Sequence, residues 1–449
     1  MTQATEQPRL QRRLGARDAS LIVMGGIIGS GIFVNPSRVA RFVHTGPLVM
    51  LAWAIGGAIA LIGAGVFAEL AARRPQDGGV YAYLRDAFHP VVAFSYGWTL
   101  LLISQGGGAA ASAVTFAFYI PAITGIHLSS AMTTIVAVSV IALFTLVNCL
   151  GVRQGASTQN AFMIAKLVAI VGVVGVGIFA IGNAVAHPAS NATVPPFDPF
   201  VAIGLALVPV MFAYSGWQTS SFMSAELRDP QRNLARGMLY GVLGVVVLYL
   251  AVNAVCLIAL GQDGLARTDT PASDVVRAVF GPIGGTIMAT IVAISTLGFI
   301  TNQILTAPRV YYQMAADGTF FSALAKIDPR THVPVVAIAV QGIAAMLIAM
   351  SGKYDVILNW VTSIDYIFFG FAALALVIFR RRDAASGAPK PFFTIPLHPW
   401  STGAFLVVAW AIVLDVLVKS RSDTLIGFAV LLTGIPVYFA FRRKAARER

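Results

Sequence analysis

Apolar runs of about 20 residues recur along the whole chain, separated by short polar breaks. A helix of that length crosses the hydrocarbon core of a bilayer, which is about 30 Å thick. Hydrophobic residues make up 57% of the sequence and charged residues only 11%, so the runs leave no room for a soluble domain. We therefore expect an all-α integral membrane protein that is surrounded by the lipid bilayer.

Twelve transmembrane spans are predicted from these runs. Most of the 31 lysine and arginine residues lie on the side of the two termini, which the positive-inside rule places in the cytoplasm. The formal charge of +12 follows from this topology, and because the basic residues are spread over all the inner loops we expect no nucleic-acid partner. The spans cover residues 19–42, 47–72, 90–119, 130–149, 157–182, 200–226, 234–260, 283–314, 333–350, 355–379, 402–418 and 424–441.

The polar and basic N-terminus runs into the first span without a small-residue cleavage site, so we expect no removable signal peptide. Cys149 and Cys256 lie in or at the end of apolar spans and predict no disulfide. The six histidines are scattered, mostly in loops. Because no nucleophile lies beside a base and no metal ligands cluster, we expect no enzyme, no metal site and no cofactor. A membrane receptor that moves nothing across the bilayer is a rival hypothesis.

The first span contains GGIIGSGIF at residues 25–33, whose glycines each cost about 1 kcal/mol in a helix relative to alanine. A pair at Gly25 and Gly29 can serve close helix packing. Packing does not require the further crowding at Gly29-Ser30-Gly31, which predicts an unwound turn. A break of this kind is tolerated in lipid only where it lines a polar cavity or meets a ligand.

A second break is predicted in the sixth span, where Tyr214-Ser215-Gly216 interrupts PVMFAYSGWQTSSF at residues 209–222. An ordinary proline and glycine kink is the alternative. Each break lies in the first span of a block of five, and the two blocks would face opposite ways, as in transporters built from inverted repeats with broken helices. The predicted organisation is a cytoplasmic tail (1–18), repeat 1 (19–182), repeat 2 (200–380), two additional helices (400–441) and a second cytoplasmic tail (442–449).

The two breaks together predict a site for a free α-amino acid. The amides of Ser30 and Gly31 would lie at the start of a half-helix, where the positive helix end favours a carboxylate. Carbonyls released at Ile27, Phe212 and Ser215 can accept from an ammonium group. The predicted substrate-binding residues are Ile27, Gly29, Ser30, Gly31, Phe212, Ala213, Ser215, Gly216 and Trp217.

Ionisable residues inside the spans are functional candidates because they are costly in lipid. Lys166 either extends to the inner headgroups or contacts carbonyls of the first break as a sodium ion would, which would make transport independent of sodium. For Asp365 there are two alternatives. It is paired with a hydroxyl or a backbone amide and has only a structural role, or it lines the cavity, where it binds a hydrogen-bond donor of the substrate or carries a proton. Gln105, Gln218 and Ser295 are further candidates for the pocket or for coupling.

Two carboxylates at cytoplasmic span ends predict inner-gate or structural ion pairs. Glu69 is close in sequence to Arg73 and Arg74, and Glu226 is close to Arg228.

Small and aromatic residues add three expectations. Phe212 suits an outer lid over the site, and Trp217 suits a pocket wall. The run at residues 105–108, QGGG, permits the close approach of another helix or of a ligand.

Several stretches in combination carry a resemblance over residues 14–442. They are GGIIGSGIF, AELAARRPQDGGVYAYLRDAF (68–88), the lysine of the fifth span, FAYSGW (212–217) with AELRDPQRNLARG (225–237), and PRVYYQMAADGTF (308–320). Together they resemble the amino acid, polyamine and organocation transporter superfamily, and within it bacterial amino acid permeases and the L-type exchangers.

The resemblance implies a five-plus-five inverted-repeat fold, alternating access, location in the inner membrane, and Lys166 in place of sodium. Gln218 and Asp365 stand where L-type exchangers usually carry asparagine and a neutral amide. Ser215 replaces a glycine of relatives that take large substrates, which favours exchange of small to medium neutral amino acids. Residues 120–129 hold no cysteine, so we expect no disulfide-linked heavy subunit. The alternative is a proton-coupled permease for cationic amino acids or polyamines, with Asp365 as the anionic partner.

Overall fold

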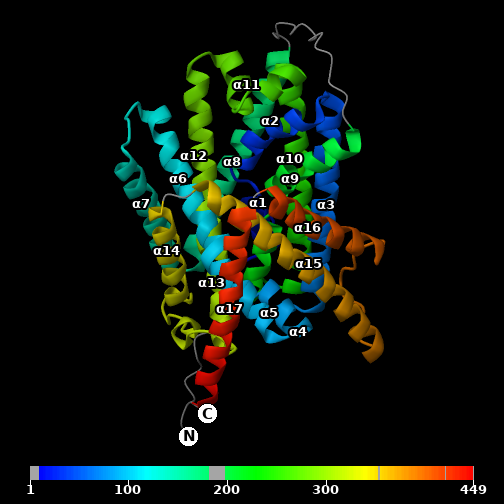
Figure 1. Ribbon diagram of the computed structural model, residues 1–449. Helices are drawn as coiled ribbons and strands as arrows, with labels where there is room; N and C mark the ends of the chain where they lie inside the picture. Colours follow the sequence, from blue (N-terminus) through cyan, green and yellow to red (C-terminus); the bar gives the residue numbers. More distant parts are fainter. Residues whose placement is uncertain (1–9, 182–197, 352–353, 420, 448–449) are drawn as a thin grey trace.

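The computed structural model describes residues 10–181, 198–351, 354–419 and 421–447. Apart from one isolated bridge between Leu14 and Leu227, the regular structure in these ranges is helical, and Figure 1 shows the helices packed as a bundle. The expected all-α class is therefore confirmed.

Ten helices in the described ranges are long and apolar enough to cross a membrane. The bent pair α1 (Ala16–Ile27) and α2 (Gly31–Val43), with an angle of 50° between its helices, makes an eleventh if it is counted as one span. In the described residues, each of the twelve predicted spans coincides with one helix or with two or three consecutive helical segments, and residue 182, the predicted end of the fifth span, lies outside these residues. The ninth, α14 (Val335–Met350), is a shorter apolar helix of 16 residues.

Seven of the long helices run without a change of helix type. α10 contains a kink at Gly261, where φ is +67°. The seven are α3 (Gly46–Arg73), α7 (Ser130–Cys149), α8 (Val152–Ile181), α10 (Pro230–Arg267), α15 (Tyr354–Ser386), α16 (Trp400–Lys419) and α17 (Arg421–Arg447).

The other three of the ten long spans are composite, because each joins two or three helical segments. In the third span a π-helical turn, η1, separates two α-helices, and in the sixth span a 3-10 helix, η2, follows an α-helix. The composite spans are α5 (Pro90–Thr99), η1 (Leu100–Ser104) and α6 (Gln105–Thr124); α9 (Pro199–Tyr214) and η2 (Trp217–Glu226); and α12 (Ile283–Thr306) and α13 (Pro308–Ala316).

Short helices between the spans mark the two ends of the bundle. α4 (Val80–Ala87) lies at the end where α17 finishes, whereas α11 (Pro271–Phe280) caps the opposite end (Figure 1). The 3-10 helix η3 (Ser322–Ala325) follows α13. The spans alone did not predict these short helices.

Large apolar side chains are exposed along the outer helices, as expected where a bundle meets lipid. Leu146 of α7, Val168 of α8, Leu347 of α14 and Leu414 of α16 are each more than half exposed. Exposed apolar side chains of this kind fit a hydrocarbon environment.

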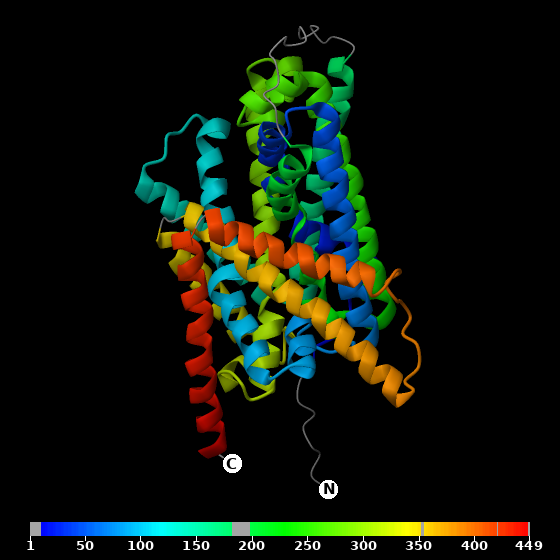
Figure 2. The ribbon, with the colours of Figure 1, turned by 45° about the vertical axis from the view of Figure 1, so that its right-hand side comes forward.

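The two broken spans lie inside the bundle. α1 packs against α10, α8, α12 and η2, and α2 packs against α9. Figure 2 shows α15 and α16 crossing obliquely outside this core, with α17 on the outside of the bundle. This arrangement places the breaks at the centre of the molecule.

Candidate functional site

The first span is broken at residues 28–30, where the glycine cluster predicted a break. α1 ends at Ile27, Ile28 is extended (φ −76°, ψ 93°), and α2 begins at Gly31. Among the described residues, the amides of Ser30 and Gly31 donate no hydrogen bond to the backbone. The start of α2 therefore presents free donors together with the positive end of its helix dipole.

The sixth span is broken at Ser215 and Gly216, as predicted. Ser215 is extended (φ −67°, ψ 154°), and Gly216 has a φ of +122°, which residues with side chains rarely adopt. The chain then continues as the 3-10 helix η2. In this helix the hydroxyls of Thr219, Ser221 and Ser224 each donate to the carbonyl three residues earlier. These side-chain hydrogen bonds add to the backbone hydrogen bonds, whose geometry is poorer in a 3-10 helix than in an α-helix.

Glycines hold the two broken spans in direct contact. A Cβ at Gly216 would lie 2.1 Å from Gly26 O, and one at Gly26 would lie 2.7 Å from Gly216 O. A Cβ at Gly25 would lie 1.9 Å from a glutamine side chain of α8. At Gly29 the nearest atom, on Phe299, would be 3.6 Å away. Gly25 and Gly26 therefore serve close packing, whereas Gly29 does not.

Carbonyls released by the first break accept hydrogen bonds from three different helices. The bonds are Tyr249 Oη to Ile27 O (3.3 Å), Lys166 Nζ to Ile28 O (2.7 Å) and Ser295 Oγ to Gly29 O (3.2 Å). The Tyr249 hydroxyl also lies 3.3 Å from Ala213 O in α9. Because a hydroxyl carries one proton, it cannot donate to both carbonyls at once, and one of them keeps its acceptor capacity.

Lys166 points into the bundle and does not extend to the headgroups. Its side chain is buried, at 1% exposure, and its ammonium contacts the first break, as one of the two sequence interpretations expected. A Cβ at Gly298 of α12 would lie 2.7 Å from Lys166 Cε and 3.2 Å from Nζ. The missing side chain at Gly298 thus makes the space that the ammonium occupies.

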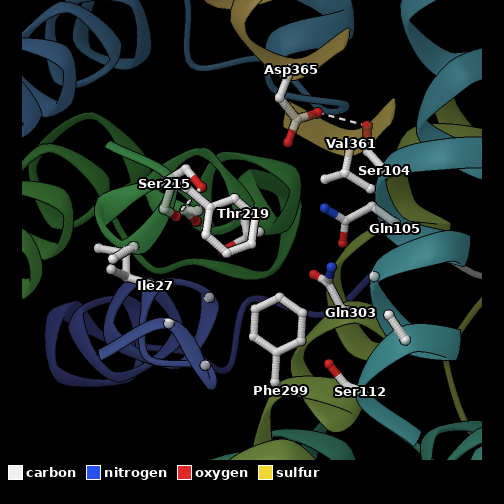
Figure 3. Close-up of a pocket in the computed structure, with 18 of the residues that line it drawn as sticks. Ile27, Ser104, Gln105, Ser112, Ser215, Thr219, Phe299, Gln303, Val361 and Asp365 are labelled. Carbon is white, nitrogen blue, oxygen red and sulfur yellow. Dashed lines mark hydrogen bonds between the residues drawn. The ribbon is translucent and has the colours of Figure 1, made fainter. Parts of the chain in front are cut away.

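Both breaks open on one cavity of about 770 Å³, a volume that includes its open mouth. Figure 3 shows α1 and α9 with η2 on one side of the cavity, and the η1–α6 junction, α12 and α15 around the remainder.

Most of the residues predicted from the sequence line this cavity. Lys166 and Ser295 do not line it, and they contact the first break from behind. Those that line it are Ile27, Gly29, Ser30, Gly31, Gln105, Phe212, Ala213, Ser215, Gly216, Gln218 and Asp365.

The structure differs from the sequence interpretation at Trp217, which is not a pocket wall. Its ring is fully buried and packs against Phe67, Phe369 and Phe405, with centroid distances of 6.4, 5.1 and 6.1 Å. The first turn of η2 directs the indole away from the cavity and into this aromatic cluster. Sequence position beside a break did not reveal that direction.

Several lining residues were not singled out from the sequence. Gln303 could have been found, because it is a polar residue inside an apolar span, and Ser104 directly precedes Gln105. The apolar and small residues gave no comparable signal. The lining residues not singled out are Ser104, Ser112, Thr219, Phe299, Gln303 and Val361. Gly26 and Gly108 also line the cavity and lie in the GGIIGSGIF and QGGG runs noted from the sequence, and Ala111 lies shortly after QGGG.

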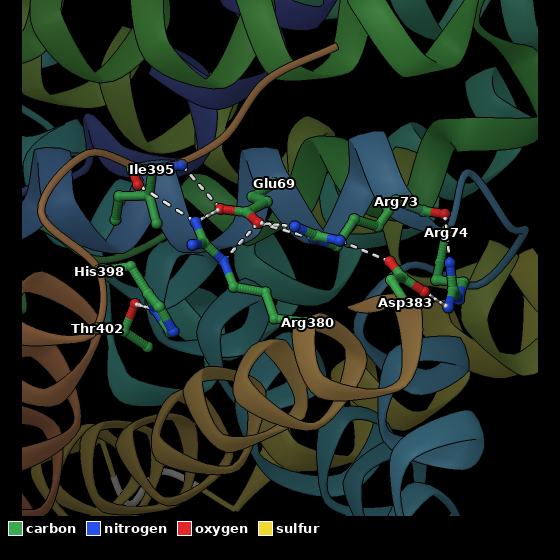
Figure 4. Close-up of polar contacts among 8 residues, drawn as sticks. All are labelled: Glu69, Arg73, Arg74, Arg380, Asp383, Ile395, His398 and Thr402. Atoms are coloured by element: carbon green, nitrogen blue, oxygen red, sulfur yellow. Dashed lines mark hydrogen bonds and ion pairs between the residues drawn. The ribbon is translucent and has the colours of Figure 1, made fainter. Parts of the chain in front are cut away.

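A network of ion pairs joins α3 to α15 near their C-terminal ends (Figure 4). Glu69 is fully buried, and its carboxylate pairs with Arg73 (2.7 Å) and Arg380 (2.5 Å) and accepts from the amide of Ile395 (2.7 Å). Asp383 extends the network by pairing with Arg73 and with a further arginine, Arg74, at 2.6 and 2.5 Å.

The predicted partner of Glu226 was wrong. Glu226 pairs with Arg309 of α13 at 3.0 Å, and both side chains are buried. Arg228 is its neighbour in sequence but is exposed. The chain folds a guanidinium from 83 residues away onto the carboxylate.

Comparisons with known proteins agree with this architecture. Residues 14–441 match the model of a family described as amino acid permease. The chain is 29% identical over 437 residues to the mouse b(0,+)-type amino acid transporter 1, covering 96% of this chain and 88% of the relative. It is 29% identical to the human large neutral amino acids transporter small subunit 2 (96% and 80% covered) and 26% identical to the serine/threonine exchanger SteT of Bacillus subtilis strain 168 (98% and 99% covered).

The resemblance noted from the sequence motifs is thereby confirmed along almost the whole chain. The family model spans both broken helices and every element that lines the cavity. The chain belongs to the amino acid permease family.

Proposed function

We propose that this protein is a sodium-independent amino acid transporter that works by alternating access and exchanges small to medium neutral L-amino acids. The observation that carries the proposal is the break in the first span. Its free amides and its released carbonyls meet at one cavity.

The substrate carboxylate would bind at the start of α2. The amides of Ser30 and Gly31 offer two donors at a positive helix end, and both residues line the cavity. Helix N-termini of this kind bind anions in many proteins. A carboxylate there gains charge-assisted hydrogen bonds that a neutral group cannot match.

The substrate ammonium would bind to carbonyls at the ends of α1 and α9. Ile27 and Ala213 both line the cavity, and their carbonyls share a single donor in Tyr249. The carbonyl of Phe212 is less available, because it accepts from the hydroxyl of Ser215 at 2.9 Å. An ammonium between α1 and α9 would supply the missing protons.

Lys166 would take the place of a coupling sodium ion. Its Nζ donates to Ile28 O at 2.7 Å, and unwound backbone carbonyls of this kind coordinate the ion in sodium-coupled transporters. A protein with this built-in cation needs no sodium to hold α1 and α8 together.

Alternating access would follow from two inverted repeats, residues 19–182 and 200–380, with helices 400–441 outside them. Each repeat begins with a broken span, α1–α2 in the first and α9–η2 in the second. Rocking of one repeat against the other about a fixed central site is the movement such repeats support. Both termini would be cytoplasmic, in a bacterial inner membrane.

Two observations support a small to medium neutral substrate: the side chain of Ser215 in the cavity, and the substrates in the names of the relatives. Ser215 lines the cavity and narrows it relative to a glycine. The relatives include a transporter of large neutral amino acids and a serine/threonine exchanger. They do not favour the alternative of a proton-coupled permease for cationic amino acids or polyamines.

The protein would act without a disulfide-linked heavy subunit. One relative is named a small subunit, but the loop after the third span, within residues 120–129, holds no cysteine. Cys256 is buried and Cys149 lies at the end of α7. Transport by the purified chain alone would support this, and a strict requirement for a second chain would contradict it.

Exchange is tested in proteoliposomes that contain only this protein. Labelled L-threonine should enter vesicles preloaded with unlabelled L-threonine much faster than empty vesicles, and replacing external sodium with choline should leave the rate unchanged. Equal uptake into loaded and empty vesicles would contradict exchange. Uptake abolished by removing sodium would contradict the role given to Lys166.

A further inference from the structure

The wall of the cavity that faces away from the two breaks is polar. It consists of Ser104 and Gln105 at the η1–α6 junction, Gln303 of α12 and Asp365 of α15. We call these four residues the polar wall. In Figure 3 they line the cavity across from the side formed by α1 and α9.

A π-helical turn at Leu100–Ser104 places two consecutive residues on this wall. In an α-helix, consecutive side chains point about 100° apart. The wider π turn lets Ser104 and Gln105 both face the cavity, and a Cβ at Gly106 would lie 2.3 Å from Leu101 O. The turn therefore requires glycine there, and such turns are frequent at functional sites.

Asp365 reaches the cavity, and one of its carboxylate oxygens has no hydrogen-bond partner among the residues that the structure describes. Ser104 Oγ donates to Asp365 Oδ1 at 2.6 Å, and Figure 3 shows the other oxygen turned toward the cavity. Within the described ranges, no lysine, arginine or histidine forms an ion pair with this carboxylate. The residue is only 9% exposed, so water does not replace the missing partner freely.

Three glutamine side-chain oxygens at the cavity also lack partners among the described residues. The side-chain oxygens of Gln105 and Gln303 are buried without a hydrogen bond, as is that of Gln218 on η2. Buried acceptors are usually paired in native proteins. On the polar wall, the unpaired oxygens of Gln105 and Gln303 together with the half-paired carboxylate of Asp365 indicate that a bound molecule supplies the donors.

We propose that the polar wall is the side-chain subsite, and that Asp365 and Gln303 select neutral amino acids whose side chain carries a hydroxyl or amide donor. The proposal rests on the proposed function, in which the breaks hold the amino and carboxylate groups. A substrate hydroxyl or amide donates to the free Asp365 oxygen or to the Gln303 oxygen. An apolar side chain of equal size leaves both acceptors buried and unpaired, and a site built to bond a polar group rejects such an isostere strongly.

The isosteric pair L-threonine and L-valine tests this selectivity on the wild-type protein. Binding of each labelled amino acid to the purified chain is measured, with unlabelled L-threonine, L-valine and L-lysine as competitors. L-threonine should bind at least about 10-fold more tightly than L-valine. Equal or tighter binding of L-valine would overturn the inference and leave the proposed function standing. Stronger competition by L-lysine would also overturn it, because the wall would then serve a cation.

Two variants test which residues discriminate between L-threonine and L-valine. If one of them fails to fold, the other still gives a result. Asp365→Leu and Gln303→Met should each bring the threonine-to-valine ratio several-fold closer to one. Thr301→Val is the control on α12, because Thr301 is satisfied by Leu297 O and does not line the cavity. An unchanged ratio in both folded variants would overturn the assignment. Absence of any amino acid binding by the wild type would contradict the proposed function as well.

Discussion

Among the described residues, the Lys166 ammonium donates to one carbonyl of the first break, Ile28 O, and occupies the space that Gly298 leaves. A glycine on one helix and a lysine on another thus act as one unit, although nothing in the sequence around either residue points to the other. The pair exists only because α8 and α12 pack together.

Gly298→Ala should reduce exchange by about 10-fold or more. The new Cβ would lie 2.7 Å from Lys166 Cε, which forces the ammonium from Ile28 O and removes a charged hydrogen bond worth about 1.5–3 kcal/mol. The initial rate of exchange in sodium-free proteoliposomes measures this. Gly175→Ala on α8 is the control, because a Cβ there meets nothing within 4 Å. Wild-type exchange by Gly298→Ala would show that the lysine position is not critical.

Gly26→Ala should lower thermal stability. Its Cβ would lie 2.6 Å from Thr219 Oγ1 and 2.7 Å from Gly216 O, and overpacking of this kind costs about 1–3 kcal/mol. Thermal unfolding of the purified protein measures the change, with Gly172→Ala as the control at an open site. A midpoint equal to that of the wild type would mean that the two broken spans separate without cost.

Residue roles were predictable where a polar or small residue interrupts an apolar span. Ser30, Gly31, Gln105 and Asp365 were found in this way and line the cavity. The direction of an apolar side chain was not predictable, and Trp217 therefore points into the core.

At the scale of elements, the two breaks could be located to within about a residue, because glycine and serine clusters are costly inside membrane helices. The type of helix on either side could not be predicted. η2 is a 3-10 helix and η1 a π turn, and an apolar run with a few serines and glycines does not distinguish these helix types from an α-helix. QGGG was interpreted as a site of close approach, and the structure adds that its first glycine permits the π turn.

Gly106→Ala should weaken amino acid binding by about 10-fold. A Cβ would clash with Leu101 O, so the span would convert to a regular α-helix and turn Ser104 away from Asp365. Asp365 would then no longer be held in place by Ser104, and a lost hydrogen bond between the substrate and this carboxylate would cost about 1.5–3 kcal/mol of binding. Titration of the purified variant measures the affinity, and circular dichroism confirms that it is folded. Wild-type affinity in a folded variant would show that the π turn has no part in binding.

At the scale of the whole molecule, ion pairs tie together helices that are distant in the sequence. Glu69 joins α3 to α15 and to the loop that carries Ile395, and Glu226 joins η2 to α13. Both carboxylates, and Arg73 as a partner of Glu69, were predictable from the sequence. Arg380 and Arg309 were not, because contacts across the bundle leave no local pattern.

Glu69→Gln should destabilise the protein by about 3–5 kcal/mol, since it removes the charge that two buried or half-buried guanidinium groups share. Asp269→Asn is the matched control. Its pair with Arg41 has similar geometry, at 2.6 Å, but the aspartate side chain is 87% exposed, and exposed pairs contribute little. Thermal unfolding of both variants measures the difference in stability. Equal midpoints would show that the ion pairs of Glu69 do not stabilise the fold.

The central claim is that the two breaks bind the carboxylate and ammonium groups of one free amino acid. Competition against labelled L-threonine, bound to the purified wild-type protein, tests it with two analogues. Threoninol lacks the carboxylate, and the corresponding α-hydroxy acid lacks the ammonium. Each should compete at least about 100-fold more weakly than L-threonine, because each leaves two or more charged hydrogen bonds unmade. If either analogue competes as well as L-threonine, the break it should address does not bind that group, and the central claim is contradicted.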